Sequence, residues 1–191
     1  MSKEKSIGNR IRYVEDDDEL RIEIQSGAEN HKVNILLGWL ILWIVVGISM
    51  VYYLFTQEIT EQNTKIVIYV FFGFWLYYFY KVFRSYRWLS KGVEDLVLDK
   101  EFFVITNRVG RRGLPIRYPI KEISKITIRQ VEVKSFQYQM ENSFWVIGGD
   151  RLQFNSGNSS IFFGKRLEEQ EARKLIKLIN ERLKRIVNKV D

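Results

Sequence analysis

Residues 35–55 have the sequence ILLGWLILWIVVGISMVYYLF, which contains twenty-one positions and no charged side chain. As a helix, this stretch rises roughly 31 Å, about the thickness of the hydrocarbon core of a bilayer. A buried helix of a soluble protein is the alternative interpretation, but such a helix normally keeps one polar face. The stretch therefore predicts a transmembrane helix.

A second uncharged stretch follows at residues 66–80, after a short polar segment. It extends to Phe83 if Lys81 directs its ammonium group to the lipid head groups. Tyr and Trp favour the bilayer interface, so the Trp75–Tyr80 end is expected near one bilayer surface. The two stretches together predict a two-helix transmembrane hairpin over residues 34–83.

The distribution of Lys and Arg predicts how this hairpin is oriented. The basic residues that follow the second helix or precede the first are Lys81, Arg84, Arg87, Lys91, Arg21 and Lys32, whereas the connecting loop has Lys65 beside Glu58 and Glu61. The positive-inside bias places both termini in the cytoplasm and the short loop outside. Residues 1–32 lack the apolar core of a cleavable signal peptide, so the first helix is expected to anchor the chain in the plasma (inner) membrane.

Positive charge is concentrated after the hairpin. Residues 92–191 carry nineteen Lys and Arg against thirteen Asp and Glu, and the juxtamembrane linker expected at 84–91 is basic as well. Anionic lipid attracts a basic surface beside the bilayer, by about 1 kcal/mol for each Lys or Arg. Nucleic acid is not expected as a partner, because the chain has no Lys/Arg block and no DNA- or RNA-binding motif.

Residues 92–191 are numerous enough to form one domain with a hydrophobic core. Short apolar or alternating segments separated by turn residues predict strands, and an amphipathic stripe predicts a helix at the end of the chain. The expected strands are 95–99, 101–107, 114–118, 126–133, 144–147, 151–155 and 159–163, and the expected helix is 167–189.

The N-terminal segment, residues 1–33, contains a further predicted β-hairpin at 10–25. Apolar and charged side chains alternate on both sides of the acidic run Glu15–Glu19. Because an isolated two-stranded hairpin is only marginally stable in water, we expect this one to add to, or pack against, the sheet of the 92–191 domain. The acidic run lacks the Gly and the bidentate Glu of an EF-hand, so no Ca²⁺ site is expected there.

Three segments of the chain resemble bacterial membrane proteins that contain a pleckstrin-homology-like (PH-like) domain. They are LVLDKEFFVITN at 96–107, YPIKEISKI at 118–126 and FFGKRLEEQEA at 162–172. Those proteins often have a two-helix transmembrane hairpin ahead of the domain. The resemblance implies an α+β fold in which the hairpin is followed by a PH-like seven-stranded β-barrel or sandwich, capped by a C-terminal amphipathic helix.

A basic turn is the candidate binding site of this domain. Phosphoinositide-binding PH domains use basic residues around their first hairpin loop, but here that loop, Asp99–Glu101, contains two carboxylates. The next turn is the better candidate for binding an anion or a protein partner, because arginine matches phosphate geometry. Its residues are Arg108, Arg111, Arg112 and Arg117. The alternative is a solvated hairpin whose charges protect a sheet edge from aggregation.

Catalysis is not expected from the residues present. His31 is the single histidine and the chain has no cysteine, which removes the common zinc sites and Cys–His nucleophiles. No phosphate-binding loop, dinucleotide-binding glycine pattern or zinc-protease motif occurs. We therefore expect neither an enzyme nor a metal or other cofactor.

These features predict a non-enzymatic, membrane-anchored PH-like interaction or scaffold module at the inner membrane face. Its expected partners are the lipid bilayer, anionic lipid head groups, and an unknown protein or further copies of the chain. The alternative is a subunit of a small oligomeric membrane transport or assembly complex. That alternative requires several copies, because two helices alone form no pathway.

Overall fold

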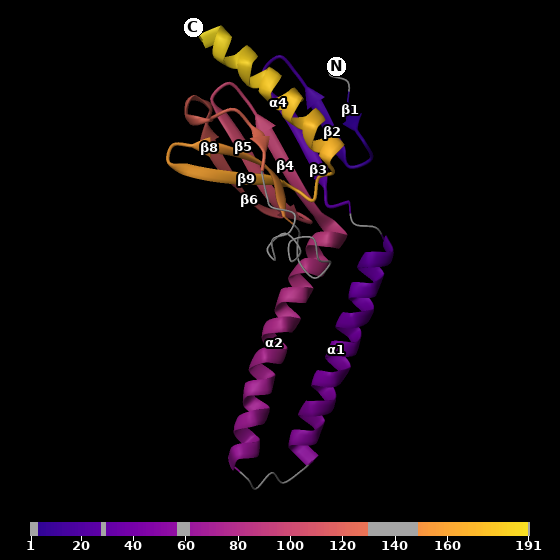
Figure 1. Ribbon diagram of the computed structural model, residues 1–191. Helices are drawn as coiled ribbons and strands as arrows, with labels where there is room; N and C mark the ends of the chain where they lie inside the picture. The colour runs from indigo at the N-terminus through magenta and orange to yellow at the C-terminus, as the bar shows by residue number, and fades with distance from the viewer. Residues whose placement is uncertain (1–3, 28–29, 57–61, 130–148, 191) are drawn as a thin grey trace.

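The computed structural model describes residues 4–27, 30–56, 62–129 and 149–190. Two long antiparallel helices lie side by side, and a β domain stands at the end where the first helix begins and the second one ends (Figure 1). Helix α1 is Asn30–Thr56 and helix α2 is Gln62–Lys91, and both are long and apolar enough to cross a membrane. In the most apolar stretch of each helix, only 17% and 11% of the residues are buried.

Helix α2 is longer than the apolar stretch from which it is predicted. It continues through the whole of the segment 84–91, for which a linker is predicted, and ends directly before the first strand of the β domain. The segment contains neither Pro nor Gly, which would end a helix, and its Trp88 is buried. At Gly92 a Cβ atom would overlap the Trp88 carbonyl, so the chain passes from helix to strand in a corner that only glycine fits.

Two tryptophans join the helices midway along the hairpin. The indole N–H of Trp43 donates to the backbone carbonyl of Trp75 at 3.2 Å, and the indole N–H of Trp75 donates to the carbonyl of Trp43 at 3.0 Å. Gly47 permits this approach, because a Cβ atom there would overlap the Trp75 ring. Trp75, expected at a bilayer surface from its residue type, therefore belongs to the helix–helix contact.

The larger sheet, called sheet A, is an antiparallel meander of six strands in chain order. Its strands are β1 (Lys5–Ile7), β2 (Ile11–Glu15), β3 (Leu20–Gln25), β4 (Gly92–Leu98), β5 (Phe102–Val109) and β6 (Arg112–Pro119). Strand β3 pairs with β4 from Leu20 opposite Leu98 to Gln25 opposite Val93. The predicted N-terminal hairpin thus adds to the sheet, and both transmembrane-length helices are inserted between two adjacent strands.

A smaller sheet, called sheet B, follows a short 3₁₀ turn at Ile120–Glu122. Its strands are β7 (Thr127–Ile128), β8 (Asp150–Ser156) and β9 (Ser159–Lys165), paired in that order, and the last element is helix α4 (Glu169–Val190). The predicted C-terminal helix agrees with α4 to within two residues at its start. The strand predicted at 144–147 lies outside the described residues, as does the end of the strand predicted at 126–133.

Of the barrel or sandwich that the resemblance implies, no closed barrel forms within the described residues, where the fold is mixed α+β with two separate antiparallel sheets. One face of sheet A forms one side of the hydrophobic core, and sheet B and α4 cover that face (Figure 1). Side chains alternate strictly along β4, with Leu96 and Leu98 buried. Helix α4 contributes Leu175 and Ile179, both fully buried, from its predicted apolar stripe. The helix thus closes the sheets as expected.

Strand β3 offers a matched pair of substitutions that tests its place in sheet A. Ile22 is 3% exposed and belongs to the core, whereas the exposed side chain of the adjacent Arg21 points to the opposite face, where it pairs with the half-buried Glu19. We expect Ile22→Ala to lower the free energy of unfolding by about 2–5 kcal/mol. Arg21→Ala should change it by about 0.5 kcal/mol or less. The measurement is urea unfolding of the full chain in detergent micelles, followed by protease susceptibility. Equal losses in the two variants would contradict the register.

Two glycines of α1 provide a similar comparison within the hairpin. A Cβ atom at Gly47 overlaps the Trp75 ring, whereas a Cβ atom at Gly38 has no atom within 4 Å. Gly47→Ala should therefore weaken the contact between the helices by about 1–3 kcal/mol, through overpacking. Gly38→Ala should have no such effect. Unfolding in mixed micelles of a mild detergent and dodecyl sulfate measures both, and a hairpin that tolerates Ala at position 47 would contradict the packing described.

Candidate functional site

The basic β5–β6 turn lies beside the end of helix α2. Val109 at the end of β5 pairs with Gly92 at the start of β4, and the Gly110 N–H points to the carbonyl of Lys91 at 3.4 Å. Gly110 has a φ of +66°, a conformation that glycine adopts without strain. The turn residues Arg111 and Arg112 are exposed. The β5–β6 turn is therefore shorter than the strands predicted at 101–107 and 114–118 imply, and it places the exposed Arg111 and Arg112 next to the helical hairpin.

Arg108 is not part of this free basic group. Its guanidinium donates two hydrogen bonds to Asp95 on β4, at 2.7 and 3.0 Å, and lies 3.8 Å from Glu23 on β3. The hydrogen bonds to Asp95 raise the pKa of Arg108, so the cation is held in this pair. Arg108 connects three strands on the outer face of sheet A, and its guanidinium is engaged within the sheet.

Arg117 is also separated from the turn. It lies five residues after Arg112 on β6, roughly 17 Å along the strand. It is exposed on the outer face, opposite Val104. Of the four arginines predicted to form one site, the structure keeps Arg111 and Arg112 together, commits Arg108 to an internal pair and places Arg117 elsewhere.

The basic residues of α2 approach the same end of the β domain. Lys81, Arg84, Arg87 and Lys91 are all exposed. Arg84, Arg87 and Lys91 fall on one stripe of the helix, because residues three, four or seven apart share a face. The stripe ends at Lys91, which touches the β5–β6 turn through the backbone. The five residues Arg84, Arg87, Lys91, Arg111 and Arg112 are called the basic end below.

Acidic residues gather at the opposite end of sheet A. The β2–β3 turn and the β4–β5 turn lie next to each other there, joined by an ion pair of 2.6 Å between Lys100 and Asp18. The carboxylates of these two turns are Glu15, Asp16, Asp17, Asp18, Glu19, Asp99 and Glu101. Arg185 of α4 neutralises one of them, Glu15, at 3.0 Å. The turns of sheet A thus differ in charge, basic beside the helices and acidic at the far end, where Arg182 and Arg185 of α4 contact the acidic β2–β3 turn.

A buried charged cluster also lies near the basic end, and no sequence pattern predicts it. Lys165 at the end of β9 lies 3.4 Å from Asp150 on β8 and 3.9 Å from Glu94 on β4. Glu94 is 1% exposed, and burial raises the pKa of its carboxyl despite the nearby lysine. In the sequence, Glu94 and Asp95 are simply two adjacent carboxylates. Strand alternation turns one inward and the other outward to Arg108.

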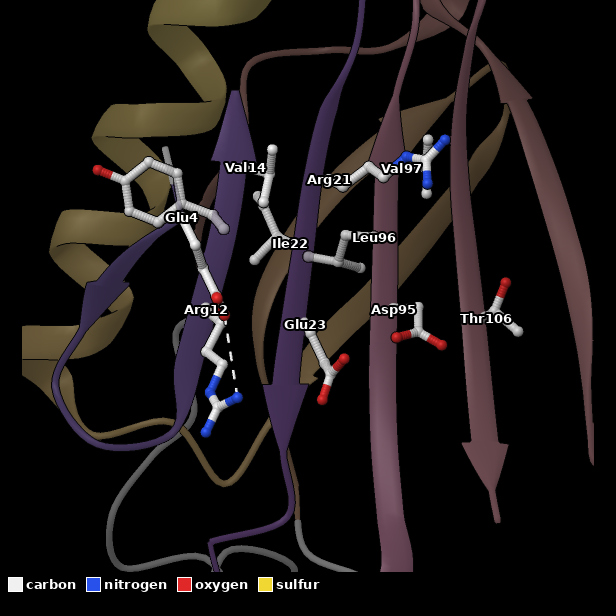
Figure 2. Close-up of a pocket in the computed structure, with 11 residues that line it drawn as sticks. Glu4, Arg12, Val14, Arg21, Ile22, Glu23, Asp95, Leu96, Val97 and Thr106 are labelled. Carbon is white, nitrogen blue, oxygen red and sulfur yellow. Dashed lines mark ion pairs between the residues drawn. The ribbon is translucent and has the colours of Figure 1, made fainter. Parts of the chain in front are cut away.

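A shallow groove with a volume of about 520 Å³ lies on the outer face of sheet A (Figure 2). Its charges are of both signs and largely paired. Arg12 lies 3.9 Å from Glu4, and Glu23 and Asp95 are the two carboxylates that hold Arg108. The residues that line this groove do not include a nucleophilic side chain hydrogen-bonded to a general base. The groove therefore suggests no reaction.

His31 stands in the first turn of α1 and is exposed. Among the described residues, no group of three His, Asp or Glu side chains is placed to hold a metal ion. Comparison of the chain with protein-family models, with curated proteins and with solved structures finds no match. The function has to be argued from the arrangement of charge and apolar surface alone.

Substitution of Arg108 and of Arg111 tests whether Arg108 is the one that stabilises the sheet. Arg108→Ala should lower the free energy of unfolding by about 1 kcal/mol, because it breaks a partly exposed pair that connects three strands. Arg111→Ala removes the same charge from an exposed position in the adjacent turn and should leave stability unchanged. Urea unfolding of the full chain in micelles compares them. A larger loss from the Arg111 variant would contradict the assignment of Arg108 as the internal residue.

Proposed function

We propose that this chain is a non-enzymatic, membrane-anchored module. Its helical hairpin inserts in the plasma (inner) membrane, and its β domain rests on the cytoplasmic surface with the basic end towards anionic lipid. The observation that carries the proposal is the position of Arg111 and Arg112 beside Lys91, with the acidic turns at the far end of the same sheet. An anionic surface attracts the first end and repels the second.

The exposed apolar surface of the helices supports insertion. Large apolar side chains point away from the protein along both helices, among them Leu42, Ile48, Phe55, Val67 and Phe74, each more than half exposed. A soluble protein rarely leaves a contiguous apolar surface of this length in water. In a bilayer these side chains lie in lipid, and the Trp43 and Trp75 indole N–H groups are already satisfied by carbonyls.

The dimensions of α2 support contact between the basic end and the head groups. Lys81 and Lys91 are about 15 Å apart along the helix axis. With the Lys81 ammonium at the hydrocarbon boundary and a head-group layer roughly 5–8 Å thick, Lys91 stands about one Debye length from the lipid charges. The long side chains of Arg111 and Arg112 cover much of that distance. Each basic group so placed contributes about 1 kcal/mol of attraction.

The PH-like resemblance is compatible with this proposal in a modified form. The described residues form nine strands, and the last seven of them, β3 to β9, followed by α4, would correspond to the strands and helix that the resemblance implies. The first of the seven strands precedes the helices rather than following them, so the helical hairpin would be an insertion within a PH-like domain. The acidic β4–β5 turn lies at the opposite end of sheet A from the basic end. The proposal therefore does not place lipid binding at that loop, where phosphoinositide-binding PH domains have it.

The proposal predicts that anionic lipid draws the basic end to the membrane. The chain has no cysteine, so Leu114→Cys, at an exposed position on β6, gives a single fluorophore near the basic end. Asn158→Cys, in the exposed β8–β9 turn, places one at the far end. Energy transfer to head-group acceptors should rise at position 114 when phosphatidylglycerol is added to phosphatidylcholine vesicles. It should stay low at position 158.

Charge-reversal variants distinguish attraction of the basic end to anionic lipid from an effect of the net charge of the whole chain. Arg111→Glu should lower the ratio of docked to undocked domains roughly fivefold or more, since each charge contributes about 1 kcal/mol. Lys184→Glu makes the same charge change on the exposed side of α4 and should have little effect. Equal responses of the two variants would contradict the proposal. Release of the chain from membranes by alkaline carbonate would contradict insertion itself.

A further inference from the structure

Helix α2, sheet A and sheet B meet at the side chain of Lys165. Its ammonium group donates to Asn107 on β5 at 2.9 Å and lies 3.4 Å from Asp150 on β8. It also stands over the ring of Trp88, in the last turns of α2, at 5.3 Å from the ring centre. One lysine at the end of β9 therefore contacts both sheets and the helix that leads to the hairpin.

Glu94 connects the same elements through the backbone. One of its carboxylate oxygens accepts the N–H groups of Gly164 and Lys165, at 2.9 and 3.1 Å. The other lies 3.9 Å from the Lys165 ammonium. Gly164 has a φ of +74°, which turns the two successive N–H groups of β9 towards β4. The carboxylate is thus a bridge between sheet A and sheet B.

The charges of this cluster do not balance. Two carboxylates, Glu94 and Asp150, share one ammonium group, and each has an oxygen without a hydrogen-bond partner among the described residues. The indole N–H of Trp88 likewise has none there. A buried carboxylate that is only partly paired is costly, and a proton on one of the two would leave the cluster neutral. Glu94 is the more buried of the two, so it is the one that takes the proton.

We propose that Glu94, Asp150 and Lys165 form a proton-operated latch that fastens sheet B and the end of α2 to sheet A. The latch is closed when Glu94 carries a proton. When the proton is lost, separation of β9 from β4 becomes easier, because opening returns the carboxylate to water. This inference concerns the joint between the helices and the β domain, and it is independent of which lipid the basic end contacts.

The direction of the pH effect follows from the surroundings of Glu94. Burial raises the pKa of its carboxyl and Asp150 adds to this effect, whereas Lys165 and the two backbone N–H groups oppose it. Asn107 and Trp88, the facing residues from β5 and α2, carry no charge. Because the pKa is higher in the closed state than in the open state, the stabilisation is complete below the open-state pKa. It is lost as the pH rises through the closed-state pKa.

Hydrogen exchange of the full chain in lipid nanodiscs tests the latch. The readout is protection of the 159–168 segment across mildly acidic to mildly alkaline pH, corrected for intrinsic exchange, with 11–25 as an internal reference. Protection of 159–168 should fall as pH rises, by up to about tenfold for each pH unit between the closed-state and open-state pKa values. Glu94→Gln should abolish this dependence. Glu101→Gln, an exposed carboxylate at the far end, should retain it.

A second variant keeps the proposal testable if Glu94→Gln fails to fold. Asp150→Asn removes the neighbouring negative charge, which helps to raise the pKa of Glu94. The fall in protection of 159–168 should therefore shift to lower pH in this variant. The latch is refuted if wild-type protection is independent of pH, if Glu94→Gln keeps the wild-type profile, or if Asp150→Asn leaves the profile in place.

Discussion

The pairing of β3 with β4 is the contact on which the arrangement of this protein depends. These strands lie on either side of the helical hairpin in the chain, yet they form one continuous ladder from Leu20–Leu98 to Gln25–Val93. Neighbouring strands are about 4.8 Å apart, so α1 must begin close to the point where α2 ends. The ladder therefore forces the helices to be antiparallel neighbours, and the Trp43–Trp75 contact fixes how they face each other.

The meander then determines where charge is placed. Successive turns of an antiparallel sheet alternate between its two ends, so the β2–β3 and β4–β5 turns share one end, while the β5–β6 turn lies at the other with both helix connections. The first two turns are rich in carboxylates, and the third carries Arg111 and Arg112. Charges that are scattered along the sequence become separated in space. The proposed orientation of the domain next to an anionic surface rests on this separation.

Features that depend on local sequence could be predicted, and features that depend on long-range register could not. The uncharged runs, the alternating strands and the stripe of α4 each reflect a pattern within one segment. The partner of Arg108 was not predictable, because Asp95 becomes its neighbour only through the β4–β5 register. That the hairpin at 10–25 joins or packs against the sheet could be predicted, but its ladder with β4, which lies beyond both helices in the chain, could not. The helical continuation of α2 through 84–91 was not predictable for a related reason, because its Trp88 is buried by tertiary contacts.

The buried carboxylate of Glu94 lies directly after the transition from α2 to β4. Gly92 forms a tight corner against Trp88, so there is no flexible segment between helix and sheet. Two residues after the corner, Glu94 accepts the N–H groups of Gly164 and Lys165 and so links β4 to sheet B. A fully apolar contact at this position would be as stable or more so. A titratable group makes the stiffness of the joint depend on proton concentration, which an apolar contact would not do.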